Sequence, residues 1–280
     1  MIPTSLQDFK ILENGVRIPV MGLGVWKAGS GVETQNAVSY ALEAGYRAVD
    51  TAAIYGNEAD VGKAVRESGI DRNEVFITTK VWYTDQGYEG TLKAFDESLK
   101  RLQTDYVDLY LIHHYMGSKL RDTWRAMEKL YAEKRVRAIG VSNFLEHHLE
   151  ELCAFAEIKP ALNQIEMHPY LRQRETLRYD QRHGIQTESW APLAKGQVLA
   201  EPVVMDLAER YRKTPAQVVL RWGLQLGVIL IPKSIKRERI IENAQIFDFE
   251  LNDVEMGKID SLEKDLRFGS HPDDWAQWMK

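Results

Sequence analysis

The sequence predicts an α/β protein, a closed (β/α)8 TIM barrel, and three of its features point to that fold. Segments typical of strands alternate with segments of helical periodicity along most of the chain. Several strand-like segments are apolar at every position, as parallel strands buried on both faces are; 109–112 is an example. No obvious linker interrupts the alternation, which favours a closed barrel over an open doubly wound sheet.

The strand predictions come from short apolar runs bounded by polar or turn residues. They cover residues 20–25, 48–51, 75–80, 107–113, 138–142, 161–166, 185–190 and 228–232. Helical periodicity fills the gaps between them. Thr214 and Pro215 are typical of a helix N-cap and first helical position, and predict a helix over 216–226. A second predicted helix, 203–211, falls in the same gap, so one of the two is extra to the repeating unit.

Both ends of the chain depart from the repeating pattern. Residues 9–12 and 16–19 flank an Asn-Gly pair, which predicts a β-hairpin that could cap one end of the barrel. Residues 266–280 predict an irregular tail that folds over the barrel mouth. The whole chain, 1–280, is expected to be one domain, because barrels of about 250 residues form single domains.

Composition excludes several classes of function. The hydrophobic content of 44 % is ordinary for a globular protein, and the net charge of −5 opposes binding to nucleic acid or anionic membranes. The single cysteine, Cys153, excludes an intramolecular disulfide and a multi-cysteine metal site. No signal peptide and no run of about 20 apolar residues is found. We expect a cytoplasmic, monomeric protein that acts on small molecules.

Ionisable side chains follow three consecutive predicted strands. Asp50 ends the second strand, Lys80 the third and His113 the fourth, and Tyr55 lies in the loop after the second. In a parallel barrel these positions share the face on which chemistry is done. Each residue alone has a simpler explanation, such as a helix cap, a half-buried phenol or a solvated strand end. Their joint placement favours a functional site.

These four residues suit acid catalysis at a carbonyl group. A free phenol has a pKa of about 10, which a neighbouring ammonium lowers. We expect Lys80 to make Tyr55 acidic, Asp50 to orient Lys80, and His113 to hydrogen-bond the substrate oxygen. No nucleophile with an adjacent base is present. Adjacent histidines, such as His147 and His148, should face different ways, so no metal site is predicted. A hydride from a nicotinamide is then the natural electron donor.

A nicotinamide would bind without the Rossmann glycine fingerprint, because the GxG at 22–24 lacks the third glycine and the acidic partner. Later strands provide other groups. Ser142, Asn143 and Gln164 suit a carboxamide, and Trp190 suits ring stacking. The segment after the last strand is rich in cations and precedes a helix, as barrel phosphate sites do. Its polar residues are Lys233, Ser234, Lys236, Arg237 and Arg239. A solvated basic face balanced by Glu238 and Glu242 is the alternative; several cations suit a 2′-phosphate, so NADPH is preferred to NADH.

Blocks of sequence along nearly the whole chain resemble the aldo-keto reductase family. They read GYRAVDTAAIYGNE, ITTKVW, DLYLIHH, IGVSNF, NQIEMHP and IPKSIKRERIIEN. The resemblance implies a (β/α)8 barrel that reduces aldehydes and ketones with NADPH. It places the family's catalytic tetrad on Asp50, Tyr55, Lys80 and His113, and its nicotinamide contacts on Ser142, Asn143, Gln164 and Trp190. It places contacts to the 2′-phosphate and adenine on Lys233, Ser234, Arg239, Glu242 and Asn243.

Within that family the chain is most similar to short microbial and protozoan members, which include reductases of 2,5-diketo-gluconate and methylglyoxal and a prostaglandin F synthase. It departs from them at two places near the substrate. His114 and Tyr115 stand where Trp-Pro is usual, and Tyr83 stands where many relatives carry Asn. We expect Trp26, Tyr83, His114 and Trp275 to line a permissive substrate pocket.

Two other functions remain open from the sequence. A cofactor-sensing regulatory subunit, similar to potassium-channel β-subunits, could use the same barrel but would need a partner surface. A barrel glycosidase could use Glu166 and Glu188, whose carboxyl groups would have to lie about 5–5.5 Å apart for a retaining mechanism.

Overall fold

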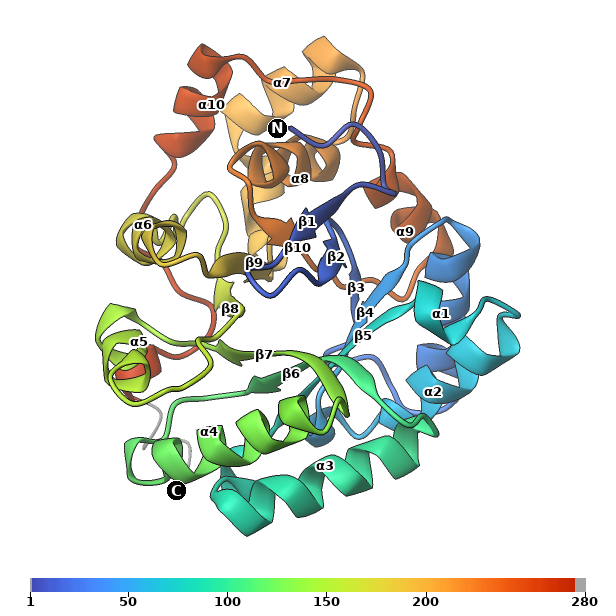
Figure 1. Ribbon diagram of the computed structural model, residues 1–280. Coiled ribbons are helices and arrows are strands. Elements are labelled where there is room, and N and C mark those ends of the chain that lie inside the picture. Colours follow the sequence, from blue (N-terminus) through green and yellow to red (C-terminus); the bar gives the residue numbers. More distant parts are fainter. Residues whose placement is uncertain (1, 275–280) are drawn as a thin grey trace.

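Eight parallel strands follow one another in sequence order around the centre of the molecule, in a computed structural model that describes residues 2–274 (Figure 1). Each strand pairs in parallel with the next one along the chain. The strands are β3 (Leu23–Gly24), β4 (Ala48–Asp50), β5 (Phe76–Val81), β6 (Val107–Ile112), β7 (Val136–Ser142), β8 (Leu162–Glu166), β9 (Gln186–Trp190) and β10 (Ile229–Leu230). The predicted barrel fold and its eight strands are confirmed.

The first and last strands meet at a seam that closes the barrel. Bridges join Met21 to Leu230 and Gly24 to Lys233, and the Gly24 amide donates to the Pro232 carbonyl at 3.2 Å. A Cβ atom on Gly24 would lie 2.9 Å from the carbonyl oxygen of Ile231. This close backbone approach explains a glycine there. β3 and β10 are shorter than predicted because the flanking residues make only single bridges.

Helices surround the strands on the outside (Figure 1). They are α1 (Val32–Glu43), α2 (Glu58–Glu67), α3 (Tyr88–Leu102), α4 (Gly117–Ala132), α5 (Glu146–Cys153), α6 (Arg174–Arg182), α7 (Pro202–Tyr211), α8 (Pro215–Gln225), α9 (Arg237–Ala244) and α10 (Asp253–Asp260). Short 3₁₀ turns η1 (Ala53–Tyr55), η2 (Arg72–Glu74), η3 (Tyr83–Asp85) and η4 (Ala194–Ala200) lie between them. Both α7 and α8 fall between β9 and β10, as predicted, and Thr214 caps α8 by accepting from the Gln217 amide.

Side chains of each strand alternate between two cores. Leu109 and Leu111 of β6 belong to the core inside the barrel, whereas Tyr110 and Ile112 pack in the layer between strands and helices. Both sets are fully buried. This alternation is the two-residue period of an extended strand, and it explains why β6 is apolar throughout.

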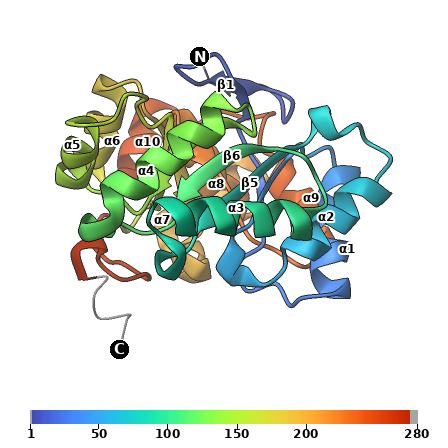
Figure 2. The ribbon, with the colours of Figure 1, turned by 60° about the horizontal axis from the view of Figure 1, so that its bottom comes forward.

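The two ends of the barrel differ. The hairpin of β1 (Phe9–Ile11) and β2 (Arg17–Pro19) inserts Leu12 and Ile18 into the inner core at the N-terminal ends of the strands. Figure 2 shows this hairpin at one end of the molecule and the last described segment at the other. Among residues 2–274, no helix is long and apolar enough to cross a membrane.

We predict that Gly62→Ala destabilises the fold by about 1–3 kcal/mol, because a methyl group there would overlap the Leu102 carbonyl where α2 packs on α3. Gly257→Ala in α10 is the matched control, since its new methyl group meets open space. It should stabilise by up to about 1 kcal/mol through helix propensity. Urea unfolding followed by circular dichroism measures both, and equal shifts in the same direction would refute the packing argument.

Candidate active site

The candidate site follows from the inward-facing positions of the strands. On β4, Ala48 lies in the inner apolar core, so the two-residue period turns Asp50 inward as well. The same period leads from Phe76 to Lys80 on β5 and from Leu111 to His113 after β6. Inward positions are therefore apolar near the hairpin and polar at the opposite, C-terminal end of the barrel.

A buried ion pair forms the centre of this polar layer. The Lys80 Nζ atom lies 2.6 Å from Asp50 Oδ1, and it also donates to the Thr51 carbonyl at 2.9 Å. The Lys80 side chain is fully buried. Its Nζ atom lies 5.1 Å from the centroid of the Tyr55 ring. The structure thus brings together the three residues that the sequence placed on separate elements.

The expected acidity of Tyr55 is corrected by the structure. Burial raises the pKa of its phenol above 10, and the ammonium of Lys80 opposes that rise without overcoming it. Burial alone would lower the pKa of Lys80, yet Asp50 and Tyr55 hold it above its usual value. Tyr55 is therefore protonated and Lys80 charged at neutral pH. This is the protonation state of an acid ready to donate.

His113 stands beside Tyr55 in the cavity wall. The two rings make an edge-to-face contact with centroids 5.6 Å apart. Burial lowers the pKa of His113 well below 6.5, and His114 and Lys80 add to the effect. Within residues 2–274 its Nδ1 atom is buried without a hydrogen-bond partner. An unpaired buried N–H costs more free energy than an unpaired ring nitrogen without hydrogen. The neutral His113 ring is therefore more stable with its proton on Nε2.

These groups open into a large cavity at the C-terminal ends of the strands. Its volume is about 1320 Å³. Predicted site residues that line it are Trp26, Asp50, Tyr55, His113, His114, Ser142, Asn143, Gln164, Trp190, Lys233, Ser234, Lys236, Arg239, Glu242 and Asn243. Lys80 lies beneath this surface. A cavity of this size leaves room for a dinucleotide and a small substrate together.

One predicted pocket residue is misplaced. Tyr83 does not belong to the cavity lining in the described part of the chain; its neighbour Trp82 does. The reason is the strand period, which turns Trp82 to the same side as Lys80. Trp82 contacts both His113 and His114, with centroids 5.0 and 5.5 Å apart, and Tyr83 packs on its ring. Trp275 lies outside the described residues.

Four polar residues meet where a planar carboxamide could lie. Asn143 Nδ2 donates to the His113 carbonyl at 2.9 Å and to Ser142 Oγ at 3.0 Å, and Trp190 Nε1 donates to Asn143 Oδ1 at 2.9 Å. Gln164 Nε2 donates to Asp50 Oδ2 at 2.7 Å. This contact ties the candidate cofactor residues to the candidate catalytic group.

The other end of the cavity is cationic. Lys233, Lys236 and Arg239 are exposed, and within residues 2–274 no carboxylate pairs with any of them. Glu242 forms no ion pair with them among the described residues, and its Oε1 accepts from Thr214 Oγ1 at 2.7 Å. Arg237 differs, since its guanidinium approaches Glu43 at 3.5 Å. These three cations, which form no ion pair within the described residues, suit the binding of an anion.

The described tail covers one side of the cavity mouth. The backbone amides of Phe268 and Gly269 donate to the two oxygens of Glu166, at 2.6 and 2.9 Å. Lys195 Nζ donates to the Phe268 carbonyl at 2.8 Å. The sequence predicts a tail over the barrel mouth, but it does not predict that Glu166 holds this tail, because the contact joins segments about a hundred positions apart. No local pattern in the sequence signals it.

The argument that adjacent histidines face apart is wrong at α5. The Nε2 atoms of His147 and His148 lie 2.9 and 3.1 Å from the same oxygen of Asp273. Ring rotation about the side-chain bonds allows this. The Leu145 amide donates to Nδ1 of His148 at 3.2 Å, so the neutral ring carries its proton on Nε2. To bind a metal ion, Nε2 would need a free lone pair, and the proton occupies that position. These contacts favour hydrogen bonds that fasten the tail to α5 over a metal site.

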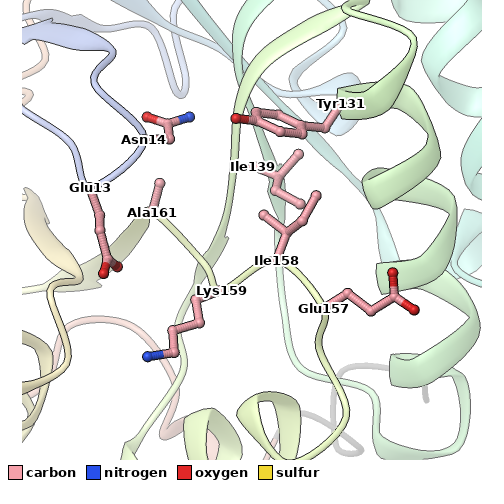
Figure 3. A pocket seen from close by; sticks show the side chains of 8 residues that line it. All are labelled: Glu13, Asn14, Tyr131, Ile139, Glu157, Ile158, Lys159 and Ala161. Atoms are coloured by element: carbon pink, nitrogen blue, oxygen red, sulfur yellow. The ribbon is translucent and has the colours of Figure 1, made fainter.

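A smaller cavity of about 300 Å³ lies at the opposite end of the barrel, next to the hairpin turn. Its charged side chains are Glu13, Glu157 and Lys159. Figure 3 shows that their ends point in different directions instead of toward one centre. Residues at this face of a barrel usually serve stability, and this cavity brings no reactive groups together.

We predict that His114 makes the fold less stable in acid. Burial lowers its pKa to about 4, whereas an unfolded chain would titrate near 6.5, so the unfolded state binds more protons between these values and stability falls as pH decreases through them. His114→Phe keeps an aromatic ring without this proton. Relative to wild type it should gain about 2–3 kcal/mol of unfolding free energy between pH 7.5 and 4.5, measured by urea unfolding.

The control is His183→Phe, which removes an exposed imidazole from the end of α6. An equal gain in His183→Phe would show that the effect is not specific to His114. A difference between wild type and His114→Phe that stays constant from pH 7.5 to 4.5 would show that His114 is not the group responsible.

Comparisons with known proteins agree with this geometry. The chain is 57 % identical over 273 residues to the glyoxal reductase of Bacillus subtilis (strain 168), covering 98 % of this chain and 99 % of that one. It is 51 % identical over 267 residues to the 9,11-endoperoxide prostaglandin H2 reductase of Trypanosoma cruzi (strain CL Brener), covering 94 % of each. The crystal structure of a Bombyx mori aldo-keto reductase in complex with NADP superposes with a TM-score of 0.89 at 34 % identity, covering 96 % of each chain.

Residues 20–264 match the sequence pattern of the Aldo/keto reductase family. The match spans the barrel from β3 through α10, including every residue of the buried ion pair and of the cationic end. Together with the relatives above, it shows that this chain is an oxidoreductase and belongs to the aldo/keto reductase family.

Proposed function

We propose that this enzyme reduces small aldehydes and dicarbonyl compounds to alcohols with NADPH, using Tyr55 as the general acid. The observation that carries the proposal is the fully buried Lys80–Asp50 pair next to Tyr55 and at the edge of the cavity. A buried ion pair is a weak source of stability, so its presence at the cavity floor favours a role in chemistry.

The residues divide the chemistry as follows. NADPH, when bound, supplies a hydride to the carbonyl carbon. Tyr55 donates its phenolic proton to the carbonyl oxygen as negative charge builds there. Lys80 stabilises the phenolate that remains, and Asp50 keeps Lys80 charged. His113, neutral and protonated on Nε2, donates a hydrogen bond to the same oxygen and aims it at Tyr55.

The residues present fit a nicotinamide dinucleotide phosphate. Ser142, Asn143 and Gln164 would hold the carboxamide, and the face of Trp190 would support the ring. At the cationic end, Lys233, Ser234, Lys236 and Arg239 would hold the 2′-phosphate, with Glu242 and Asn243 toward the adenine. Unpaired cations recognise a phosphate better than a ribose hydroxyl, which supports NADPH over NADH.

A small substrate is supported by the walls around Tyr55 and by similarity. Trp26, Trp82, His113 and His114 leave an aromatic, largely uncharged space beside the phenol. The similarity to a glyoxal reductase favours dicarbonyl compounds over large substrates. A panel of small aldehydes, dicarbonyls and keto-sugars, followed through NADPH absorbance, tests this; no turnover on any of them would favour the cofactor-sensing alternative. The monomeric state and the cytoplasmic location stay predictions from the sequence.

We predict that Tyr55→Phe lowers kcat for glyoxal reduction at least about 100-fold, because the proton donor is lost while the ring remains. NADPH affinity, measured by quenching of tryptophan fluorescence, should stay near wild type. Tyr110→Phe is the matched control: its hydroxyl is buried outside the barrel without a hydrogen-bond partner among the described residues. Near-normal turnover by Tyr55→Phe would overturn the proposed role.

We predict that Arg239→Ala weakens NADPH binding about 10- to 100-fold and NADH binding little, because a charge-assisted contact to a phosphate contributes about 1.5–3 kcal/mol. Arg237→Ala removes a neighbouring arginine that is directed toward Glu43, and should leave the ratio of the two affinities unchanged. Fluorescence titrations with both cofactors measure the ratio. An equal loss for NADPH and NADH in Arg239→Ala would contradict a 2′-phosphate site.

A further inference from the structure

Glu188 is a buried carboxyl group that the proposed chemistry does not use. It lies on β9, two residues before Trp190, so its side chain faces the inside of the barrel. Its exposed fraction is 2 %. A glutamate in such a position is costly unless its polar atoms are engaged, and its hydrogen-bond partner therefore indicates its role.

That partner is Gln164. The Glu188 Oε2 atom accepts from Gln164 Nε2 at 2.6 Å, and the same nitrogen donates to Asp50 Oδ2 at 2.7 Å. A carboxamide nitrogen has two hydrogens, so both are held by carboxyl groups on opposite sides. The Asp50 carboxylate and the Glu188 Oε2 atom both act as acceptors, and together they fix which end of the amide is nitrogen. Among residues 2–274, the Gln164 side-chain carbonyl oxygen is left without a hydrogen-bond donor.

The surrounding charges make this arrangement stable. Burial raises the pKa of Glu188 to about 8, and the charge of Asp50 adds to the rise, while Gln164 and Lys80 oppose it. Burial and the charge of Asp50 both favour the neutral form of Glu188, which leaves Lys80 to balance the charge of Asp50. A neutral carboxyl group still offers an acceptor oxygen to the Gln164 amide. Two negative carboxylates around one amide are avoided.

We propose that Glu188 is a positioning residue of the cofactor site: with Asp50 it fixes the Gln164 side chain so that its carbonyl oxygen accepts a hydrogen bond from the carboxamide N–H of the nicotinamide. This inference rests on the proposed function, because it concerns the same cofactor. Through Gln164, a residue of β9 would thereby help to fix the position of the nicotinamide carboxamide. Without Glu188 only Asp50 holds the Gln164 amide, so one of the two contacts that fix its orientation is lost.

The test compares two cofactors in a chemical double-mutant cycle. NADP⁺ carries a carboxamide, whereas its 3-acetylpyridine analogue carries an acetyl group without N–H donors. Dissociation constants are measured by tryptophan fluorescence quenching at pH 7. Wild type should prefer NADP⁺ about 10-fold, the equivalent of one net hydrogen bond. Glu188→Leu, which removes the acceptor at similar volume, should reduce that preference to about 1- to 3-fold.

Three variants separate positioning from mere structural support. Glu188→Gln keeps a neutral side chain with an acceptor oxygen and should restore the preference. Glu188→Met removes the acceptor with a more adaptable side chain, and takes the place of the leucine variant if that variant does not fold. Glu58→Leu removes an equally buried glutamate that contacts Thr79 and Arg101 outside the barrel, and should lower stability without changing the preference.

The outcomes distinguish this inference from the proposed function. Wild type that discriminates between the cofactors, together with Glu188→Leu or Glu188→Met that discriminates equally well, would overturn the role of Glu188 alone. Failure of wild type to bind either nucleotide would overturn the proposed cofactor site and this inference with it. Loss of the preference in the leucine or methionine variant, with its recovery in Glu188→Gln, would support the inference.

Discussion

The buried ion pair between Lys80 and Asp50 is the interaction on which the rest of the site depends. Removing two charges from water is expensive, and their mutual attraction in the protein interior only partly offsets that cost. Here the pair is further supported by the Thr51 carbonyl and by Gln164. The barrel supplies a rigid ring of strands within which the Lys80 side chain is fully buried.

The position of the pair follows from strand geometry. Inward side chains near the hairpin are Leu109, Phe76 and Ala48, which fill the lower part of the barrel. Moving two residues along each strand raises the side chain by one layer without changing its direction. Polar residues at the upper positions therefore converge above a packed apolar floor. One set of strands both stabilises the fold and presents the reactive groups.

Two opposing effects determine whether the Tyr55 phenol keeps its proton. Burial disfavours a charged phenolate, and the ammonium of Lys80 favours it. In the structure burial prevails, so the phenol keeps its proton in the resting protein. The ammonium contributes when the proton leaves, because it stabilises the phenolate in a low-dielectric site. In the proposed reaction, the phenol can thus keep its proton in the resting protein and still release it to an alkoxide.

The sequence by itself determined the eight strands, the N-terminal hairpin and the strand-end positions of Asp50, Lys80 and His113, because periodicity and turn residues are local signals. It also indicated the cationic segment after the last strand. The tertiary structure decided that Trp82, not Tyr83, faces the cavity, that Glu188 and Asp50 share the Gln164 amide, and that the tail is fastened to Glu166. It also decided that burial outweighs the ammonium of Lys80 and raises the pKa of Tyr55. Those outcomes depend on distances and burial between segments far apart in the chain, which no local pattern encodes.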